Sequence, residues 1–353
     1  MTIAPLDRAD LRTRIDKALA EFLARQRSRL TTIQPALVPA AEALEDFVLR
    51  GGKRLRPAFA YWGYRGAGGI DSPELVATLA ALEFVQASAL IHDDVMDGSD
   101  TRRGEPAVHR RFTGLHRRNG WSGDPEAFGQ AAAILLGDLS LVWSDELLQG
   151  GGLEPEVVAR ARPVFDQMRT EVTAGQYLDM FGQAVGDSSM DWAALVARYK
   201  SAKYTVERPL LVGAALAGAP VATTRAYSGY GLPLGEAFQL RDDLLGVYGD
   251  PARTGKPAGD DLREGKRTYL VAAAMEAADP AQRKMIETGL GNPDVDVDEL
   301  RTIITATGAR DRTEQRINDL TAEAVAALDT VRLPEEPRAV LVELASAATQ
   351  RSC

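Results

Sequence analysis

Apolar side chains recur at helical spacing in almost every part of the chain, and this periodicity constrains the fold more than any other feature. Residues one helical turn apart share a face of an α-helix, whereas a strand needs alternating apolar and polar residues, which are hard to find here. The pattern therefore predicts an all-α chain. The expected helices span about 11–30, 40–49, 73–97, 126–149, 154–185, 191–216, 222–229, 233–249, 268–277, 280–288, 297–307, 310–330 and from 335 onward.

Glycine and proline gather only in short breaks between the expected helices, such as Gly66–Gly69 and Gly150–Leu153. No break is long or polar enough for a linker between independent domains, so we expect one domain over residues 1–353. The most loop-like stretch is 112–125, FTGLHRRNGWSGDP. We interpret its His116-Arg117-Arg118 cluster as a solvated loop face.

The composition excludes several classes of protein. Of 353 residues, 45% are hydrophobic and 26% charged, which is typical of a soluble globular protein. A formal charge of −9 favours no nucleic-acid partner. The only cysteine, Cys353, allows no intrachain disulfide, which fits a cytoplasmic location. The N-terminal stretch MTIAPLDRADLRTRIDKALAEF lacks a long apolar run, so we expect neither a signal peptide nor a membrane span.

Three carboxylates stand at the end of an apolar helix in the segment ALIHDDVMDGSD. Asp93 and Asp97 lie one turn apart on the same face, and Asp94 lies slightly around the cylinder. Acids at this end also oppose the helix macrodipole, so the group needs a cation unless it is only a solvated helix end. Oxygen ligands without cysteine favour magnesium. The neighbouring His92 points away from the acids and is interpreted as a core or surface residue.

A second acidic group stands in FQLRDDLLGVYGD, where Asp242 and Asp243 are expected on another helix and Asp250, two turns after Asp242, is expected on the same face. The position one turn after Asp242 is Gly246 instead of a third acid. We therefore expect this group to hold its ion with fewer protein ligands than the first.

Basic segments accompany both acidic groups. GGKRLRP at 51–57 follows a helix break, TRRG at 101–104 follows the first acids, and TGK at 254–256 and GKR at 265–267 follow the second. Arginine grips phosphate oxygens with two donors, and lysine adds a point charge. Each basic segment alone could be a solvated surface, but together with the acids they indicate a pocket for diphosphates.

The motifs GGKRLRP, DDVMDGSDTRRG, KSAKYT and FQLRDDLLGVYGDPARTGKPAGDD resemble, in this order, those of the trans-isoprenyl diphosphate synthase (polyprenyl synthetase) family. The resemblance covers about residues 45–270. It implies an all-α, single-domain isoprenoid synthase fold with helices around a deep central cavity, two acidic groups facing each other across its mouth, and a homodimer. It also implies a chain-elongating prenyltransferase that uses isopentenyl diphosphate and allylic diphosphates.

The resemblance also implies roles for single residues. Asp93 and Asp97 would bind two Mg²⁺ ions and Asp242 a third, with Asp94 and Asp243 among the metal-binding carboxylates. Arg102 would contact the allylic diphosphate. The residues that resemble those gripping isopentenyl diphosphate are Lys53, Arg56 and Arg103. Six further positions would lie near the diphosphates or the reacting carbons: Gln86, Lys200, Ser201, Gln239, Lys256 and Lys266. Of these, Lys200 would also be catalytic. Gly246 stands where the family's second acidic motif often has its third aspartate, and this difference concerns the strength of the third metal site.

The expected reaction is magnesium-assisted loss of diphosphate, attack by the isopentenyl double bond on the allylic cation, and loss of a proton. A terpene cyclase would share the fold and the first acidic group but would lack a site for isopentenyl diphosphate, and GGKRLRP and Arg103 argue against it. A non-catalytic subunit of a heteromeric synthase is another alternative, because Gly246 could mark decay of the second site.

Product length depends on the helix below Asp93. Ser88 and Ala89, about one turn below, are too small to close the cavity, and Phe84 one turn further could form its floor. We therefore expect the twenty-carbon geranylgeranyl diphosphate. A longer polyprenyl product is the alternative if Phe84 faces the core between helices.

Overall fold

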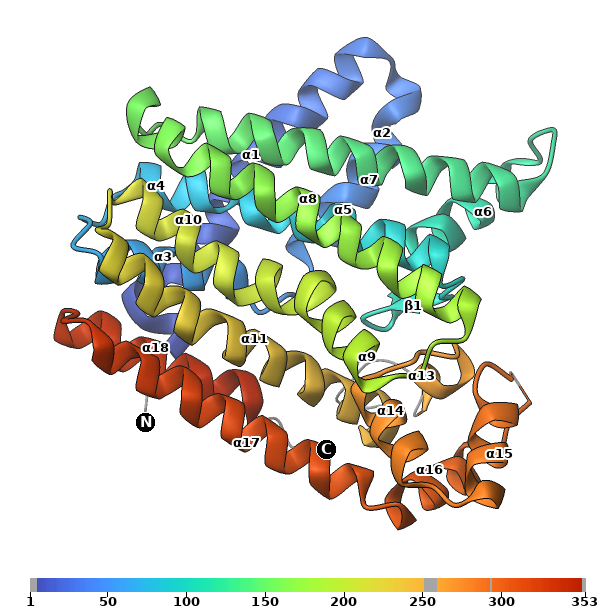
Figure 1. Cartoon of the computed structure of the whole chain (residues 1–353). Coiled ribbons are helices and arrows are strands. Elements are labelled where there is room, and N and C mark those ends of the chain that lie inside the picture. The colour runs from blue at the N-terminus through green and yellow to red at the C-terminus, as the bar shows by residue number, and fades with distance from the viewer. Residues whose placement is uncertain (1–4, 251–258, 293, 351–353) are drawn as a thin grey trace. The chain divides into compact units, whose positions relative to one another are not determined.

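The computed structural model describes residues 5–250, 259–292 and 294–350, and helices make up nearly all of their regular structure (Figure 1). The all-α prediction is confirmed. The chain forms two compact units. The N-terminal unit comprises Met1–Val164 and Val212–Ala219, and the C-terminal unit comprises Phe165–Leu211 and Pro220–Cys353. Helices α8 (Pro155–Val185) and α10 (Arg208–Leu216) each contribute residues to both units.

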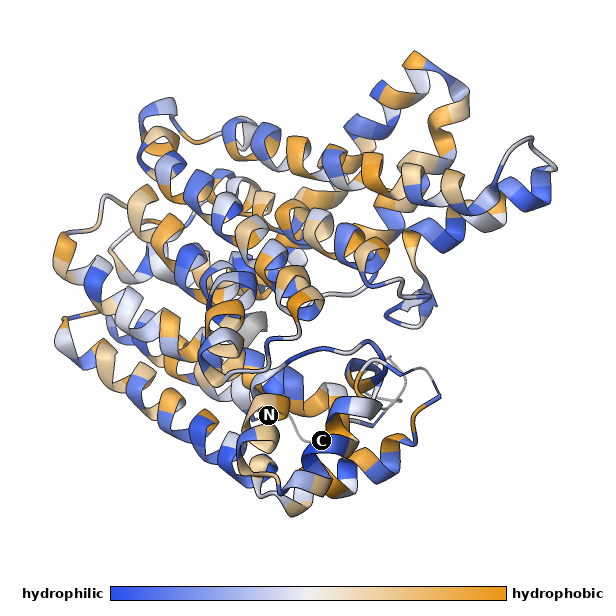
Figure 2. Cartoon of the chain, turned by 45° about the vertical axis from the view of Figure 1, so that its right-hand side comes forward, coloured by the Kyte–Doolittle hydropathy of each residue, from blue (hydrophilic) through white to orange (hydrophobic). Residues whose placement is uncertain are grey.

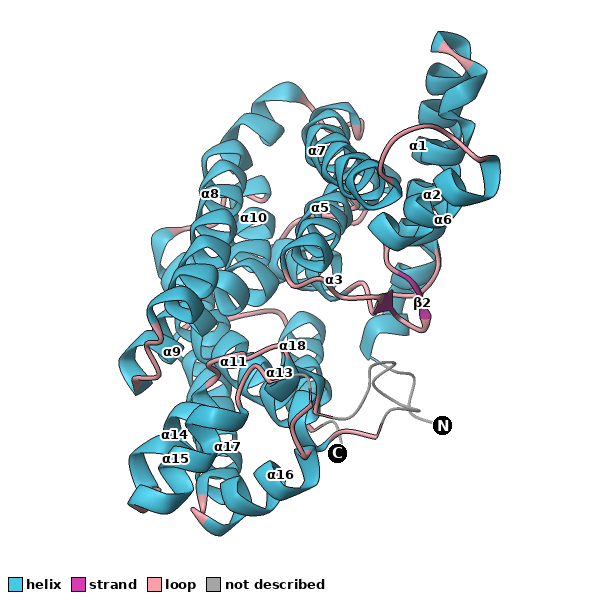
Figure 3. Cartoon of the chain, turned by 90° about the vertical axis from the view of Figure 1, so that its right-hand side faces the viewer, coloured by secondary structure: helices cyan, strands magenta, loops and turns pink. Residues whose placement is uncertain are grey.

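Long helices joined by short turns build the N-terminal unit, and a hairpin of two-residue strands holds the only strands among the described residues (Figure 3). In addition to parts of α8 and α10, its elements are η1 (Pro5–Asp10), α1 (Leu11–Ile33), η2 (Pro35–Leu37), α2 (Val38–Leu49), α3 (Leu55–Gly66), α4 (Pro73–Leu79), α5 (Ala81–Met96), β1 (Thr101–Arg102), β2 (Glu105–Pro106), α6 (Val108–Asn119) and α7 (Pro125–Gly150).

Around the long helix α11 (Val221–Tyr248), the C-terminal unit packs α17 (Ala309–Ala327) and the π-helical segment η3 (Ala197–Glu207). Its other elements, besides parts of α8 and α10, are α9 (Met190–Val196), α13 (Asp260–Arg263), α14 (Tyr269–Ala277), α15 (Pro280–Gly289), α16 (Val297–Ala306), η4 (Leu328–Thr330) and α18 (Glu335–Thr349).

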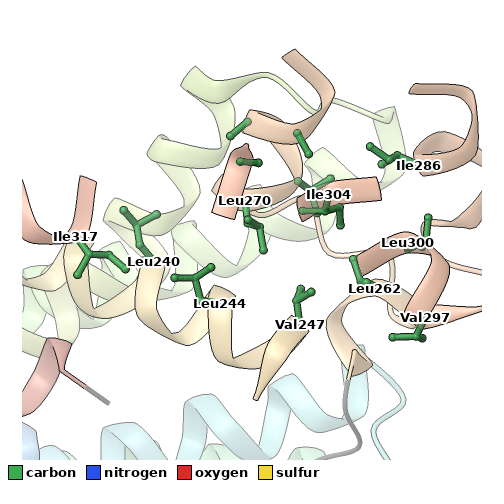
Figure 4. Close-up of a cluster of buried hydrophobic side chains, with 14 of the residues drawn as sticks. Leu240, Leu244, Val247, Leu262, Leu270, Ile286, Val297, Leu300, Ile304 and Ile317 are labelled. Atoms are coloured by element: carbon green, nitrogen blue, oxygen red, sulfur yellow. The ribbon is translucent and has the colours of Figure 1, made fainter. Parts of the chain in front are cut away.

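Each unit has its own hydrophobic core, built from helices with one apolar side (Figure 2). In the N-terminal unit α5 packs against α7, and the buried Phe84 ring makes edge contacts with Phe22 of α1 and Trp143 of α7. In the C-terminal unit, Leu240 and Leu244 of α11 belong to a buried cluster that extends to α14, α16 and α17 (Figure 4). These two cores fix the helices that carry the acidic groups.

Three glycines let helices touch the η3 backbone. A Cβ on Gly175 of α8 would lie 2.2 Å from the Lys200 nitrogen, and one on Gly235 of α11 would lie 2.5 Å from the Ala202 carbonyl oxygen. Gly231 makes a similar approach to Glu207. Any larger side chain at these positions would push η3 away, so the glycines set the position of the segment that carries Lys200.

Several expectations about local structure were wrong. The stretch 112–119 is not a loop but the end of α6, because Phe112 and His116 are buried at helical spacing, and Gly120 (φ 60°) ends the helix. Residues 55–66 form a helix, α3, that the periodicity did not predict. The expected helices 222–229 and 233–249 are one helix, α11, which retains Pro233 in its interior. Packing against α17 and η3 outweighs the proline cost of about 3 kcal/mol.

Two helical stretches of the N-terminal unit are long and apolar enough to cross a membrane by length and composition. The stretch Pro73–Met96 is 72% buried and Pro125–Gly150 is 39% buried. A core helix of a soluble protein has the same length and composition, so the expected lack of a membrane span stays a prediction.

Candidate active site

The first acidic group lies at the C-terminal end of α5. The Asp97 backbone N–H donates to the Asp93 carbonyl at 2.8 Å, and Gly98, with φ at 66°, then turns the chain away. Asp94 is fully buried, whereas Asp93 and Asp97 are partly exposed. The structure thus separates the acids into a pair that solvent can reach and one that it cannot.

Arg102 of β1 binds this group directly. Its Nε donates to Asp94 Oδ1 at 2.9 Å, its Nη2 also binds Asp94, and Nη2 lies 3.4 Å from Asp93 Oδ2. Burial disfavours the charged guanidinium, but hydrogen bonds and charges of these acids outweigh it and raise the pKa of Arg102. The arginine predicted to bind diphosphate therefore lies in ion-pair contact with two of the predicted metal ligands, Asp93 and Asp94.

A tight turn places Arg103 beside Arg102. Arg103 (φ 55°) and Gly104 (φ 79°) form the two-residue turn between β1 and β2, and positive φ at both positions is the geometry of a type I′ hairpin. Arg103 Nη1 donates to the carbonyl oxygens of Phe47 (3.4 Å) and Arg50 (3.1 Å) at the end of α2. Its guanidinium carbon lies 5.8 Å from the centre of the Phe47 ring.

The structure also brings the two basic segments together. Gly51 and Gly52 have φ values of 84° and 97°, and a Cβ on Gly51 would lie 3.5 Å from Arg103 Cδ. Lys53 is exposed and Arg56 is half-buried in the first turn of α3. The predicted isopentenyl diphosphate residues Lys53, Arg56 and Arg103 thus belong to one turn-and-hairpin region. Arg54, between them in sequence, is buried.

The remaining predicted residues of α5 divide by face. Gln86 and Ala89 are partly exposed and share a face with Asp93 at helical spacing. Ser88 is buried, and Phe84 is fully buried between α1 and α7, all within the N-terminal unit. Of the three predicted chain-length residues, only Ala89 lies on the partly exposed side below the acids.

The second acidic group lies near the end of α11. Asp243 is buried and accepts a hydrogen bond from Gln239 Nε2 at 2.7 Å. Burial raises the pKa of Asp243 to about 8; the Gln239 bond opposes this, and the charges of Asp261, Asp242 and Asp179 add to it. Asp242 is partly exposed. Asp250 was expected on the same helix face, but α11 ends at Tyr248, so that expectation was wrong.

Asp261 of α13 lies against Gly246. A Cβ on Gly246 would lie 1.8 Å from Asp261 Oδ2, so the carboxylate fills the space that a side chain at 246 would need. Lys266 Nζ lies 3.7 Å from Asp261 Oδ1 and 2.8 Å from Glu264 Oε2. Asp261 was missed as a site residue, although it ends the matching motif segment GKPAGDD.

Lys200 and Ser201 lie on η3, where Lys200 Nζ binds Asp179 Oδ2 of α8 at 2.6 Å. No motif in the sequence marks Asp179, because a fold contact and not a spacing brings it to Lys200. Lys256 lies outside the described residues. Lys200, Gln239, Asp242 and Lys266 all belong to the C-terminal unit, and whether the two acidic groups face each other stays a prediction.

Neither acidic group is a closed metal cage. Among the residues that the structure describes, no three histidine, cysteine or acidic side chains gather closely enough to hold an ion by themselves. Magnesium is usually held by one or two carboxylates, together with waters and substrate phosphates, so partly exposed aspartates beside arginines fit it. Asp93 and Asp97 in the first group and Asp242 in the second have this exposure.

Comparison with known proteins identifies the class to which this all-α fold and its aspartate groups belong. Residues 39–307 match the model of the polyprenyl synthetase family, and the chain belongs to that family. The chain is 32% identical to the short chain isoprenyl diphosphate synthase of Methanothermobacter thermautotrophicus, over 90% of this chain and 89% of that protein. It is also 32% identical to the octaprenyl diphosphate synthase of Escherichia coli, over 85% and 86%.

A solved structure resembles the whole chain. The geranylgeranyl pyrophosphate synthase from Corynebacterium glutamicum, complexed with isoprenyl diphosphate and magnesium, shares 43% of its residues and superposes with a TM-score of 0.94 over 100% of both chains. The predicted family, the isoprenoid synthase fold and the predicted enzyme class, a trans-prenyltransferase, are confirmed.

Proposed function

We propose that this chain condenses isopentenyl diphosphate with allylic diphosphates and that geranylgeranyl diphosphate is its main product. The observation that carries the proposal is the basic region of Lys53, Arg56 and Arg103, which adjoins Arg102 and the aspartates of α5. One diphosphate needs metal ligands for ionisation and the other needs only cations, and this unit offers both kinds of site. The geranylgeranyl pyrophosphate synthase of Corynebacterium glutamicum supports the product.

The first acidic group would hold the allylic diphosphate through magnesium. Asp93 and Asp97 would bind two ions and Asp242 a third, with Asp94 and Asp243 among the metal-binding carboxylates. Magnesium, when bound, supplies positive charge that stabilises the departing diphosphate. Arg102 can exchange the carboxylates that it now binds for diphosphate oxygens, because its donors fit either anion.

The other residues would position the second substrate. The C–O bond of the allylic diphosphate breaks, the isopentenyl double bond attacks the resulting carbocation, and a proton leaves to the released diphosphate. Lys53, Arg56 and Arg103 would hold isopentenyl diphosphate in place for this attack. Gln86, Lys200, Ser201, Gln239, Lys256 and Lys266 complete the proposed contacts to diphosphates and reacting carbons, with Lys200 the catalytic member.

The wider setting follows from the same assignment. The family match from residue 39 to 307 includes residues of both units, which supports their action as one polyprenyl synthetase domain over residues 1–353. We also propose magnesium as the cofactor, three ions per site, a homodimer without nucleic-acid partner or membrane span, and a cytoplasmic location. The structure that includes magnesium supports the choice of metal.

A longer polyprenyl product is the second candidate. Phe84 lies in the core against Phe22 and Trp143. From the sequence, a longer polyprenyl product is the alternative expected for this position of Phe84. The relatives do not decide product length, because a short chain synthase and an octaprenyl synthase are equally identical to this chain, at 32%.

The decisive experiment incubates the purified chain with magnesium, radiolabelled isopentenyl diphosphate and, separately, dimethylallyl, geranyl or farnesyl diphosphate. We expect label in geranylgeranyl diphosphate, identified by chromatography after dephosphorylation. Consumption of the allylic substrate without incorporation of label would indicate a cyclase. No consumption of either substrate would support a non-catalytic subunit.

A further inference from the structure

Arg54 is bound by its whole guanidinium although it lies within a predicted substrate-binding segment. Nε donates to Asp16 Oδ1 at 2.7 Å, Nη1 to Glu83 Oε2 at 2.7 Å and Nη2 to the Val48 carbonyl oxygen at 2.8 Å. The side chains of Arg54 and Glu83 are only 3% and 6% exposed. Each nitrogen of the Arg54 guanidinium thus has a protein partner, and the side chain is buried, so this arginine has another role than binding diphosphate.

The three partners come from three helices. Asp16 lies on α1, Val48 near the end of α2 and Glu83 on α5, while Arg54 itself precedes α3. Arg54 also has φ at 50°, a left-handed conformation that is rare for residues other than glycine. Together these contacts fix the backbone between Lys53 and Arg56 instead of leaving it as a mobile turn.

The contacts of Arg54 extend to the rest of the basic region. A Cβ on Gly52 would lie 3.1 Å from Arg54 Nη1 and 3.7 Å from Arg103 Nη2, so Gly52 lies beside both guanidinium groups. The pKa of Arg103 is lowered, first because its guanidinium lies among protein atoms and then by nearby arginines, while the charge of Glu83 acts in the opposite direction. Glu83 thus binds Arg54 directly, and its negative charge also acts on Arg103.

Helix α5 carries a second acid in the same role. Glu83 and Asp94 are both buried, and each binds one arginine, Arg54 and Arg102 respectively. Their separation of eleven residues is about three helical turns, so both acids lie on nearly the same face, about 16 Å apart along the axis. One rigid helix therefore anchors both basic segments at a fixed spacing.

From this geometry we infer that Glu83 and Arg54 are positioning residues for the isopentenyl diphosphate site. Glu83 holds Arg54, and Arg54 holds the turn that presents Lys53 and Arg56 beside Arg103. The inference rests on the proposed function, because it specifies how that site keeps its cations in place. The pair acts through the turn and touches no substrate.

The test separates positioning from general stability. Glu83→Gln should raise the KM for isopentenyl diphosphate about tenfold, the equivalent of one lost charge-assisted contact, while the allylic KM changes less than about threefold. Asp16→Asn is the matched control, because Asp16 also binds Arg54 but its side chain is 41% exposed. It should have a small effect on either KM.

A double variant removes the stability question. Arg54→Met with Glu83→Leu replaces a buried ion pair by apolar groups, an exchange that is often neutral for stability. We expect a melting temperature near that of the wild type with a selectively raised KM for isopentenyl diphosphate. A stable double variant with the wild-type KM would overturn the inference, as would equal rises in both KM values in Glu83→Gln.

Calorimetric titration with inorganic diphosphate in the absence of magnesium measures diphosphate binding to Lys53, Arg56 and Arg103 without the condensation reaction. Weaker binding by Glu83→Gln and by the double variant than by the wild type would support the inference even if the wild type condensed no substrates. Unchanged binding would contradict it. Failure of the wild type to consume isopentenyl diphosphate, by contrast, would contradict only the proposed function.

Discussion

At the residue scale, the aspartates of α5 have different environments and should differ in function. Asp94 is buried and bound most closely to Arg102, whereas Asp93 and Asp97 are partly exposed. Asp93→Ala or Asp97→Ala should therefore lower turnover by orders of magnitude, because each variant removes a proposed metal ligand and leaves the core untouched. Steady-state assays at saturating magnesium, together with circular dichroism, measure both effects.

The control for this prediction is Asp100→Ala. Asp100 is exposed, lies three residues beyond Asp97 and pairs with Arg110 at 2.7 Å. Its removal should leave turnover within about twofold of the wild type, as is usual for a surface ion pair. Wild-type turnover in both Asp93→Ala and Asp97→Ala would remove the first acidic group from the site.

Gly246 gives a second prediction at this scale. Gly246→Asp restores the third aspartate that the family pattern often has, yet it should destabilise the protein by about 1–3 kcal/mol, because the new side chain meets the Asp261 carboxylate. Gly246→Asp with Asp261→Gly should recover much of the loss, since it moves one carboxylate instead of adding another. Thermal unfolding and turnover of both variants check this.

Either of two results would contradict the prediction for Gly246. If Gly246→Asp alone were as stable and active as the wild type, Asp261 would not fill that space. If the double variant were no better than the single one, the carboxylate of Asp261 would have a role that position 246 cannot take over.

Which site residues the sequence could predict depends on how they come together. Asp93 and Asp97 are related by one helical turn, so spacing alone placed them on one face. Asp179 meets Lys200, and Asp261 meets Gly246, only through the packing of separate helices. No local pattern encodes such contacts, and for that reason these partners were not predicted.

At the element scale, α6 has a buried histidine that should make stability depend on pH. Burial and the neighbouring Arg110 lower the pKa of His109, so the folded protein favours the neutral ring. The unfolded chain then takes up the proton first, and stability is lost as pH falls below about 6.5. Urea unfolding at about pH 7.5 and pH 5.5 should show a larger loss in the wild type than in His109→Gln.

Equal losses in the wild type and in His109→Gln would show that another group causes the acid sensitivity. The expected direction is fixed by the sign of the shift. Above the pKa that His109 has in the unfolded chain, the histidine is neutral in both the folded and the unfolded state, and the full stability is present. Below that pKa the unfolded state binds a proton that the folded state does not, so stability is lost.

Helix α5 also gives a prediction about product length. Ala89 shares the partly exposed face with Asp93, so Ala89→Phe should shorten the main product, because a bulky ring one turn below the acids blocks the growing chain. Phe84→Ala should instead cost about 3–5 kcal/mol of stability with little change in product, because Phe84 fills the core against Phe22 and Trp143. Product chromatography and thermal unfolding distinguish the two effects.

A longer product from a stable Phe84→Ala variant would contradict this assignment and return Phe84 to the floor of the cavity. An unchanged product from Ala89→Phe would show that the chain does not grow along this face of α5. Ser88→Phe is the matched comparison, because Ser88 is buried and a ring there should reduce stability by overpacking.

Periodicity predicted most helices but not all their ends. It succeeded for α7 and α8, whose apolar faces are long and whose starts carry a proline. It failed at Pro233 and at 112–119, because tertiary packing keeps a proline inside α11 and buries His116 of α6. Local signals compete there with contacts that only the fold supplies.

At the scale of the whole molecule, an exposed apolar strip on α7 indicates a partner surface. Leu135 is 66% exposed, Val142 61% and Ile134 47%, and Leu135 and Val142 lie two turns apart on one side of the helix. Exposed apolar residues on one side of a helix, here flanked by the exposed Asp138, are typical of interaction sites in soluble proteins. A second copy of the chain would cover the strip in the homodimer that the family resemblance implies.

Leu135→Lys should therefore convert the proposed dimer into a monomer, because a charge buried in the apolar interface that we expect on α7 would cost several kcal/mol. Analytical ultracentrifugation measures the change, and Ile70→Lys is the control, because Ile70 is 81% exposed in the turn between α3 and α4, away from the strip. The wild type and Ile70→Lys should sediment as dimers. If the wild type were a monomer that binds lipid vesicles and Leu135→Lys did not bind them, the strip would be a membrane-binding surface instead. If Leu135→Lys remained a dimer, the dimer interface would lie elsewhere.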